Sequence, residues 1–234
     1  MFDFDSYIRL LREDPKTIVL PEGTDPRVIE AASRLLAGNF LQPILIGEED
    51  AVWEAAQEAG YNIRGAKILT PSTYEKMDEM VEQFCEIRAK KGMTQEKARE
   101  ILKDPNYFGT MLVKMGGADC LLGGATYSTA DTVRPALQLI KTKPGNNIVS
   151  SCFILVRGDE KIAMGDCAIN IDPSEDDLVE IAIESAKTAK IFGIDPKVAM
   201  LSYSTLGSGK GPSVTKVANA CLLYTSDAAD DLIG

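Results

Sequence analysis

The sequence predicts an α/β fold in which a parallel sheet is followed by a region with a mixed sheet. Before Pro144, short apolar runs alternate with amphipathic helical patterns, an alternation typical of parallel sheets. Beyond Pro144, two apolar runs are separated by only a charged turn, which indicates a hairpin. Two loops rich in glycine and hydroxyl residues each lie between an expected strand and an expected helix, where α/β folds bind ligands.

The composition limits the possible partners. The chain has 234 residues, 45% hydrophobic and 26% charged, with a net charge of −10. Such a chain can bury one large core or two smaller ones. The negative charge argues against nucleic acid as a partner. No apolar run approaches membrane-spanning length and the N-terminus is too acidic for a signal peptide, so we expect a cytoplasmic protein with no membrane partner.

Histidine and cysteine usage limits the chemistry. The chain contains no histidine, which excludes serine–histidine and cysteine–histidine hydrolases and histidine-containing zinc sites. We therefore expect no metal site. The five cysteines lack CxxC spacing and several lie in apolar surroundings. They are predicted to be reduced and mostly buried thiols.

The first elements follow from hydrophobic period and capping signals. Asp25 before Pro26 is a helix start, and Gly92 ends a long helix with apolar residues at helical spacing. The short apolar runs between the helical patterns are buried strands. We expect helices over residues 4–12, 26–37, 48–59, 73–91, 94–103 and 106–115, and strands over residues 17–20, 43–47, 67–69 and 119–122.

The stretch from Gly116 to Pro135 is the strongest candidate for a ligand loop. An expected strand runs into a glycine pair that includes Gly124, then into hydroxyl residues that include Ser128 and Thr129, and then into a helix. Glycines allow close backbone approach, and a helix N-terminus offers free N–H groups to an anion. The competing interpretation is a tight turn in which Ser128 or Thr129 caps the helix.

Basic residues could supply the charge that an anion needs. Arg134 lies in the helix after this loop, next to Pro135, which is expected to kink or restart that helix. Arg88 belongs to the densest basic cluster, which continues through Lys90, Lys91, Lys97 and Arg99. Cations near helix ends and on solvated faces favour a structural interpretation of this cluster. An anion site requires a fold that brings Arg88 near Arg134.

The second region begins near Pro144. The expected strands over residues 148–156 and 162–169 form the hairpin, and Asp166 in the second of them is interpreted as a structural hydrogen-bonding group. A helix over residues 175–192 and a strand over residues 198–203 follow. The second loop contains Ser204, Thr205 and Ser208 but lacks the residue order of a P-loop. Two such loops facing one another would form a cleft.

Several motifs in series resemble phosphate acetyltransferase (phosphotransacetylase). They are IVLPEGTDPRVIEAA, EIRAKKGMTQEKAREIL, GGATYSTADTVRPALQLI, SSCFIL, GDCAIN and SYSTLGSGKGPSVTKV, in the family's order and spacing. The resemblance implies two α/β domains with a cleft between them, similar to isocitrate and isopropylmalate dehydrogenases. It also implies a homodimer that transfers an acetyl group reversibly between coenzyme A (CoA) and phosphate, with CoA as a substrate and no permanently bound cofactor.

The resemblance also assigns site residues. In the family, the CoA thiolate attacks acetyl phosphate directly and phosphate leaves. By matching motif, Arg88 and Arg134 correspond to arginines that handle substrate or CoA, and Gly124, Ser128 and Thr129 belong to the loop near acetyl phosphate. Ser204, Thr205 and Ser208 are assigned to the opposite loop.

The end of the sequence departs from the family pattern. The family's Ser-Arg pair and the Asp proposed as base lie in a carboxyl-terminal region that we do not find here, so no catalytic residue is assigned. Residues 222–234 resemble a non-native tail. We expect a first domain over residues 1–144 that lacks its returning segment and the first part of a second over residues 145–221. This fragment is expected to be inactive alone and to expose apolar surface.

Three alternatives remain open at this stage. The first is phosphate butyryltransferase, because acyl chain length cannot be read from the motifs. The second is a non-catalytic module that senses acetyl-CoA, of the kind found at the end of some malic enzymes. The third is a decarboxylating dehydrogenase of the related fold, which the absence of a paired-aspartate metal motif disfavours.

Overall fold

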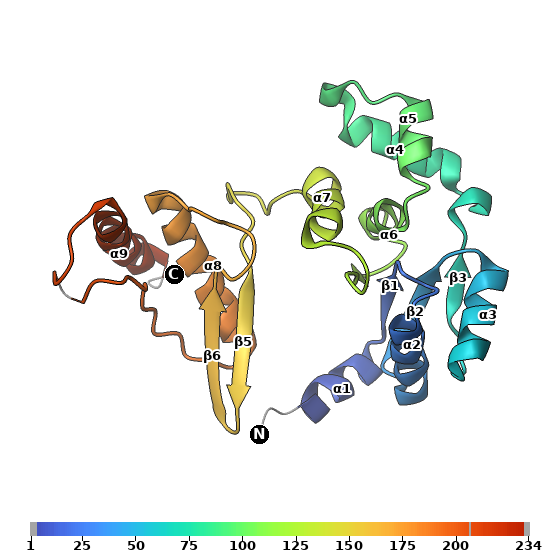
Figure 1. The fold of residues 1–234 in the computed structure, drawn as a ribbon, viewed down its shortest axis with the longest axis horizontal. Helices are drawn as coiled ribbons and strands as arrows, with labels where there is room; N and C mark the ends of the chain where they lie inside the picture. Colours follow the sequence, from blue (N-terminus) through green and yellow to red (C-terminus); the bar gives the residue numbers. More distant parts are fainter. Residues whose placement is uncertain (1–3, 206, 232–234) are drawn as a thin grey trace. The chain divides into compact units, whose positions relative to one another are not determined.

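The structure is a computed structural model that describes residues 4–205 and 207–231. The chain forms two compact units, the first ending at Lys141 and the second beginning at Thr142. The first unit contains the helices α1 (Phe4–Glu13), α2 (Pro26–Gly38), α3 (Glu49–Ala59), α4 (Met77–Ile87), α5 (Gln95–Ile101), α6 (Pro105–Lys114) and α7 (Thr129–Leu139) (Figure 1).

The first unit is organised around a four-stranded parallel sheet. Its strands lie in the order β3 (Lys67–Leu69), β2 (Leu41–Ile46), β1 (Lys16–Leu20) and β4 (Cys120–Leu121). The chain moves outward from β1 through β2 to β3 and then returns to the other side of β1. The space between the carboxyl ends of β1 and β4 is therefore a topological switch point, where open α/β sheets bind ligands.

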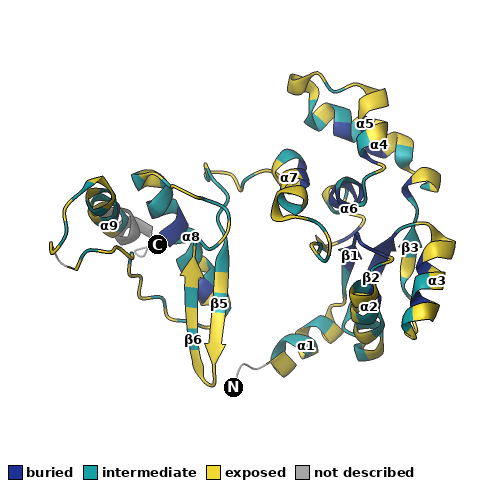
Figure 2. Ribbon diagram, viewed as in Figure 1, coloured by how far each residue is buried: buried dark blue, intermediate teal, exposed yellow. Residues whose placement is uncertain are grey.

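Alternating strand residues create two cores. Ile18 and Leu20 of β1 pack with Ile29 of α2 and Val52 of α3 on one face of the sheet. On the other face, Val19 packs in a cluster with residues of α4, α5, α6 and α7, among them Phe84, Phe108 and Leu139. Figure 2 shows the buried residues concentrated in β1, β2 and the helices around them. Both faces of the sheet are thus covered, as a parallel sheet requires.

Gly109 of α6 allows this helix to lie directly on the sheet. A Cβ atom there would lie 2.8 Å from Leu121 Cδ1 and 2.9 Å from Val19 Cγ1. Gly109→Ala gains about 1 kcal/mol of helix propensity, but overpacking a buried contact costs about 1–3 kcal/mol. We expect a net loss of unfolding free energy in urea, followed by the fluorescence of Trp53 in the same unit. A stabilised variant would contradict this packing.

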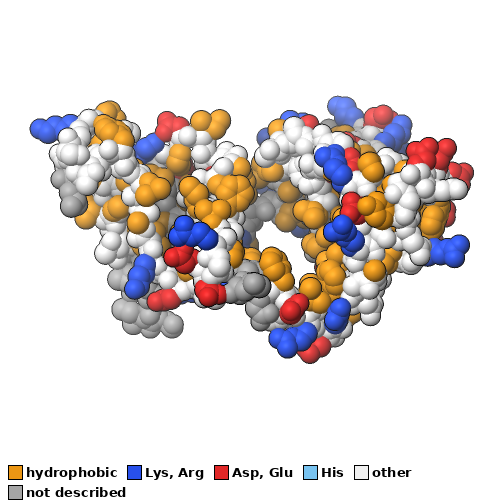
Figure 3. All heavy atoms as spheres, turned by 60° about the horizontal axis from the view of Figure 1, so that its bottom comes forward, with side chains coloured by type: hydrophobic (Ala, Val, Ile, Leu, Met, Phe, Trp, Pro, Cys, Tyr) orange, Lys and Arg blue, Asp and Glu red, His pale blue; other side chains and the backbone are white. Residues whose placement is uncertain are grey.

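The second unit contains an antiparallel hairpin and two helices. The elements are β5 (Cys152–Arg157), β6 (Glu160–Gly165), α8 (Glu175–Ile191) and α9 (Pro212–Asp231). This hairpin confirms the prediction that the two apolar runs after Pro144 form a hairpin. The hairpin leaves large apolar side chains exposed, among them Phe153, Leu155, Ile162 and Met164, and Figure 3 shows hydrophobic side chains at the surface of the molecule.

Several predicted elements were wrong in detail. The helix predicted over residues 73–91 is divided into a 3₁₀ turn (Pro71–Thr73), α4 and a second 3₁₀ turn (Ala89–Lys91) that Gly92 ends with φ +66°. The strand predicted over residues 198–203 is irregular, because none of the described strands pairs with it. Leu201 and Tyr203 are accordingly exposed.

Two side-chain predictions also need correction. Pro135 does not restart the helix, since α7 continues through it to Leu139. The proline is buried, so packing compensates for the missing N–H. The five cysteines are free as predicted, but Cys120 is exposed and the others are only partly buried. Cys120 lies on β4, an edge strand, which explains its exposure.

Candidate functional site

The loops after β1 and β4 meet at the switch point through the carboxylate of Glu22. Glu22 is 8% exposed and accepts hydrogen bonds from the backbone N–H groups of the β4–α7 loop. Gly124 N and Ala125 N each donate to Oε2 at 2.9 Å, and Thr126 N and Tyr127 N donate to Oε1, the latter at 3.0 Å. Thr126 Oγ1 also donates to Oε1, at 2.7 Å. We call this arrangement the Glu22 clasp.

The loop geometry explains the glycine at the start of the clasp. Gly124 has φ +109°, in the left-handed region that favours glycine. Successive N–H groups can then point at one anion, as in the backbone nests that bind phosphate. The N–H groups of this loop thus point at one anion, which is a carboxylate from the same chain.

The hydrogen bonds control the ionisation of Glu22. Burial alone raises the pKa of its carboxyl group, but the bonds from Thr126, Ala125 and Tyr127 outweigh burial and lower the pKa to about 2. A second contact supports the same loop, because Arg27 Nη2 donates to the carbonyl oxygen of Ala125 at 2.7 Å. Asp25 in turn caps α2 and pairs with Arg27 at 2.8 Å.

Ser128 and Thr129 lie at the start of α7. Ser128 is the N-cap, since its side chain accepts a hydrogen bond from Asp131 N at 3.2 Å and donates to Asp131 Oδ2 at 2.6 Å. The capping interpretation of this serine is therefore confirmed. Thr129 is the first helical residue and is exposed. A cap of this kind fixes where the helix begins, and with it the position of Arg134.

The charges of Arg88 and Arg134 both affect the pKa of Tyr107 on α6. Burial raises the pKa of the Tyr107 phenol, while the positive charges of Arg134 and Arg88 oppose that increase. Both guanidinium groups therefore lie within electrostatic range of one hydroxyl. The Tyr107 hydroxyl donates to Gln138 Oε1 of α7 at 3.2 Å.

The two arginines differ in their surroundings. Arg88 is the C-cap of α4, and its Nε is buried and has no hydrogen-bond partner among the described residues. The side chain of Arg134 is 56% exposed and lies 3.5 Å from Asp131. Buried donors are normally paired, so the unpaired Arg88 Nε indicates a group made to bind an acceptor.

Tyr107 and Glu22 were missed by the sequence analysis. Tyr107 lies within the apolar pattern of α6, so its phenol could not be distinguished from core packing. Glu22 follows the expected strand over residues 17–20. Its hydrogen-bond partners lie more than 100 residues away in the sequence, so the carboxylate leaves no local signal. Of the Glu22 clasp, the sequence indicated only the glycine pair after β4.

The remaining basic residues agree with the interpretation that they are cations of a solvated surface. Arg99 pairs with Asp78, and Lys103 lies 2.5 Å from Glu100. On the face drawn in Figure 3, Lys and Arg side chains are interspersed with Asp and Glu. Of the predicted cluster, Arg88 is partly buried, whereas the others are exposed, namely Lys90, Lys91, Lys97 and Arg99.

The second predicted loop is held by its own hydroxyl groups. Ser204 Oγ accepts a hydrogen bond from Gly209 N at 2.9 Å, and Ser208 Oγ accepts one from Thr205 N at 2.9 Å. These bonds shape the turn before α9. The loop belongs to the second unit.

Asp166 organises the turn after the hairpin. It accepts hydrogen bonds from Ser151 N at 3.1 Å, Ala168 N at 3.1 Å and Asn170 N at 2.7 Å, and also from the Ser151 hydroxyl and the Asn170 amide. Burial raises its pKa, but these bonds dominate and hold the pKa well below the usual range. The structural interpretation of Asp166 is confirmed.

Asp166→Ala should destabilise the second unit. The substitution leaves several N–H groups without an acceptor, at about 1–3 kcal/mol for each one that water does not reach, so we expect a loss of about 3 kcal/mol. Hydrogen exchange of the peptides spanning residues 151–170 is the measurement. The control is Asp195→Ala, since Asp195 is exposed. Equal exchange in the two variants would contradict the role given to Asp166.

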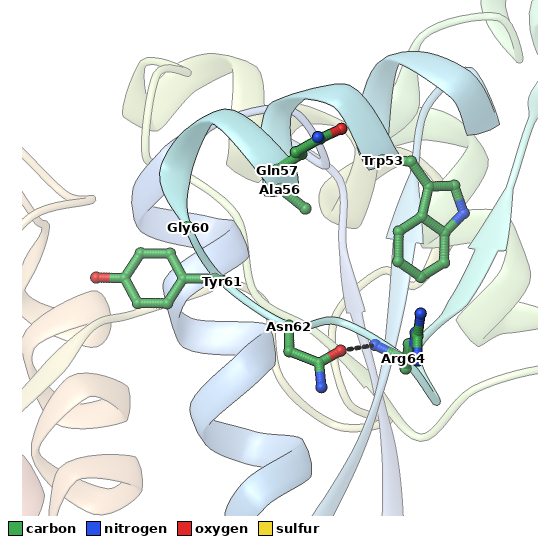
Figure 4. A pocket seen from close by; sticks show the side chains of 7 residues that line it. All are labelled: Trp53, Ala56, Gln57, Gly60, Tyr61, Asn62 and Arg64. Atoms are coloured by element: carbon green, nitrogen blue, oxygen red, sulfur yellow. Dashed lines mark hydrogen bonds between the residues drawn. The ribbon is translucent and has the colours of Figure 1, made fainter.

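A surface hollow lies elsewhere on the first unit. It is lined by Trp53, Ala56, Gln57, Gly60, Tyr61, Asn62 and Arg64, at the end of α3 (Figure 4). Asn62 Oδ1 accepts from Arg64 N at 3.0 Å, and Tyr61 points away from Trp53. The hollow contains none of the predicted site residues, and its polar groups do not converge on one point.

The described residues offer neither a metal cluster nor a membrane-spanning helix. Among the described residues, no group of three or more carboxylate or cysteine side chains could hold a metal ion. In the same part of the chain, no helix is both long and apolar enough to cross a membrane.

The comparisons with known proteins agree with the motifs. The profile of one family, described as phosphate acetyl/butaryl transferase, matches residues 4–233. Phosphate acetyltransferase of Bacillus subtilis is 54% identical over 213 residues, which are 91% of this chain and 66% of that protein. The Staphylococcus aureus enzyme of the same name is 50% identical over 214 residues, or 92% of this chain and 65% of that protein. The chain thus spans just under two thirds of the length of these relatives.

Solved structures show the same likeness. A phosphotransacetylase from Streptococcus pyogenes has a TM-score of 0.88 at 47% identity, covering 97% of this chain and 71% of that one. One from Staphylococcus aureus has a TM-score of 0.86 at 47% identity, covering 97% and 70%. The family profile, the relatives and the α/β fold agree, and the chain belongs to the phosphate acetyl/butaryl transferase family.

Proposed function

We propose that the chain functions in a phosphate acetyltransferase, an enzyme that moves an acetyl group reversibly between CoA and phosphate. Among the observations on the site, the buried Nε of Arg88, which has no hydrogen-bond partner among the described residues, carries this proposal. Both substrates are polyanions and the chain has a net charge of −10, so fixed guanidinium groups are needed where they bind. The similar proteins named phosphate acetyltransferase favour acetyl over butyryl transfer.

The proposed reaction is a direct acyl transfer. The CoA thiolate attacks the carbonyl carbon of acetyl phosphate, a C–S bond forms, and the C–O bond to phosphate breaks. Negative charge grows on the carbonyl oxygen and then on the departing phosphate. Arg88 and Arg134 stabilise that charge, which is the effect expected of preorganised donors near a reacting centre. We assign no carboxylate of the described residues as the base that takes the thiol proton.

The loop residues have supporting roles in this proposal. Gly124, Ser128 and Thr129 form the wall of the substrate site beside Arg134, and Ser204, Thr205 and Ser208 contribute from the second unit. We further propose the two-domain fold of isocitrate and isopropylmalate dehydrogenases with a cleft between the domains, a homodimer, a cytoplasmic location, and CoA as a substrate without a permanent cofactor.

Calorimetric titration of the chain with CoA tests the proposal. We expect saturable binding that acetyl-CoA displaces, and weaker binding at high salt because the contacts are charged. NADP⁺ is the matched control, since it carries a similar adenosine phosphate but no thiol arm. Absence of CoA binding, or equal binding of NADP⁺, would contradict the proposal and would favour the related dehydrogenase fold as the better guide to function.

A further inference from the structure

We propose that Glu22 is a positioning residue of the acyl-transfer site, serving as the internal anion that holds the β4–α7 loop in its working shape. This inference rests on the proposed function. It differs from that proposal in assigning a role to a residue that does not touch substrate. The loop that it holds carries Ser128 and leads into α7 and Arg134.

The clasp lies at the switch point between β1 and β4. β1 and β4 are adjacent parallel strands, and Glu22 follows the first while the glycine pair follows the second. The switch point between them is where ligands enter an open α/β sheet. Here a carboxylate from the β1 loop occupies the amide donors of the β4 loop. Those N–H groups are therefore committed to Glu22, and an incoming phosphate must be held by other groups.

The clasp fixes the loop at several points. Both carboxylate oxygens accept hydrogen bonds, from four successive backbone N–H groups and from the Thr126 hydroxyl. Charge-assisted bonds of this kind are about twice as strong as neutral ones. The hydrogen-bonded segment ends at Tyr127, the residue before the Ser128 cap. A change at Glu22 is therefore transmitted to the start of α7 through one residue of backbone.

Close packing also holds the loop, on the side away from Glu22. Gly123 packs against Pro21 and Asn106, since a Cβ atom at Gly123 would lie 3.0 Å from Pro21 Cγ and 3.2 Å from Asn106 Oδ1. Asn106 is 2% exposed, and neither atom of its amide has a hydrogen-bond partner among the described residues. The loop is thus held by Glu22 on one side and by close packing on the other. Loss of the carboxylate releases only the first of these constraints.

Chemical rescue tests the proposal. Glu22→Ala removes the carboxylate and leaves the amide donors, and formate is a carboxylate small enough to replace it. We expect CoA affinity to fall about tenfold in Glu22→Ala and to recover with formate but not with formamide, which has the same shape without the charge. Amide resonances of residues 124–127 should shift with formate in the variant alone. Glu54→Ala, at an exposed position of α3, is the matched control.

The outcomes separate the possible failures. A role in stability alone would lower the melting temperature of Glu22→Ala and leave its CoA affinity unchanged well below that temperature, which would overturn the proposal. If Glu22→Ala does not fold, Glu22→Gln replaces it, because glutamine keeps the side-chain volume. Wild-type CoA affinity in Glu22→Gln would also overturn the proposal. If the unchanged chain fails to bind CoA, the proposed function falls, and the formate-induced shifts still decide whether Glu22 holds the loop.

Discussion

Arg88→Ala and Arg134→Ala should each weaken CoA binding by about 10- to 100-fold while leaving the melting temperature nearly unchanged. A hydrogen bond to a charged group contributes about 1.5–3 kcal/mol, which corresponds to that range. Arg134 is more than half exposed, and Arg88 Nε has no hydrogen-bond partner among the described residues. Arg134→Ala removes only the exposed contact with Asp131, and surface ion pairs of this kind contribute about 0–1 kcal/mol. Calorimetric titration with CoA measures the loss.

The double variant and a distant arginine serve as controls. If both guanidinium groups bind the same ligand, the losses in Arg88→Ala and Arg134→Ala should not add in the double variant, because neighbouring sites couple. Arg34→Ala, on the exposed side of α2 with Glu30 as its partner, should bind CoA normally. Wild-type affinity in both single variants would remove these arginines from the site.

The first unit should lose about 3 kcal/mol of stability in acid through Glu22 alone. The pKa of Glu22 is about 2 in the folded chain against an ordinary value of 4.5. Because the folded pKa is depressed, this stability is fully present above about pH 4.5 and disappears as the pH falls towards 2. By about pH 3, roughly 2 kcal/mol of it should be gone.

Comparison with Glu22→Gln isolates this contribution. Other carboxylates, among them Asp25 and Asp119, also have lowered pKa values, so the wild-type chain alone cannot assign the effect. We expect the difference in unfolding free energy between wild type and Glu22→Gln to shrink by about 2 kcal/mol between about pH 6 and pH 3. Urea unfolding followed by Trp53 fluorescence measures it. A difference that stays constant with pH would show that Glu22 is not ionised in the clasp.

Local signals predicted most of the fold of the first unit. Asp25 caps α2, Thr94 caps α5 and Asp104 caps α6, and each lies where a predicted helix begins or just before it. The strands were found because a buried parallel strand reads as a short apolar run. Errors arose where tertiary context decided. Residues 198–203 have a strand-like pattern but no strand to pair with among those described, and the helix predicted to reach Lys91 ends at Ile87.

The candidate site was predicted only in part. Motif resemblance indicated Arg88 and Arg134, and the positive charges of both oppose the increase in the pKa of Tyr107. The sequence could not show that Glu22 would fill the glycine-rich loop, because the two segments are joined only by folding. Ser128 illustrates the same limit. Its hydroxyl fits a ligand contact or a cap equally well in sequence, and the hydrogen bonds to Asp131 show the cap.

Hydrogen exchange with and without CoA tests the central claim most directly. The account predicts that CoA slows exchange at the end of α4, around Tyr107 of α6, and at the start of α7, while the hollow beside Trp53 is unaffected. Protection confined to the residues around Trp53, or no protection at Arg88, Tyr107 and Arg134 under saturating CoA, would contradict the assignment of this site.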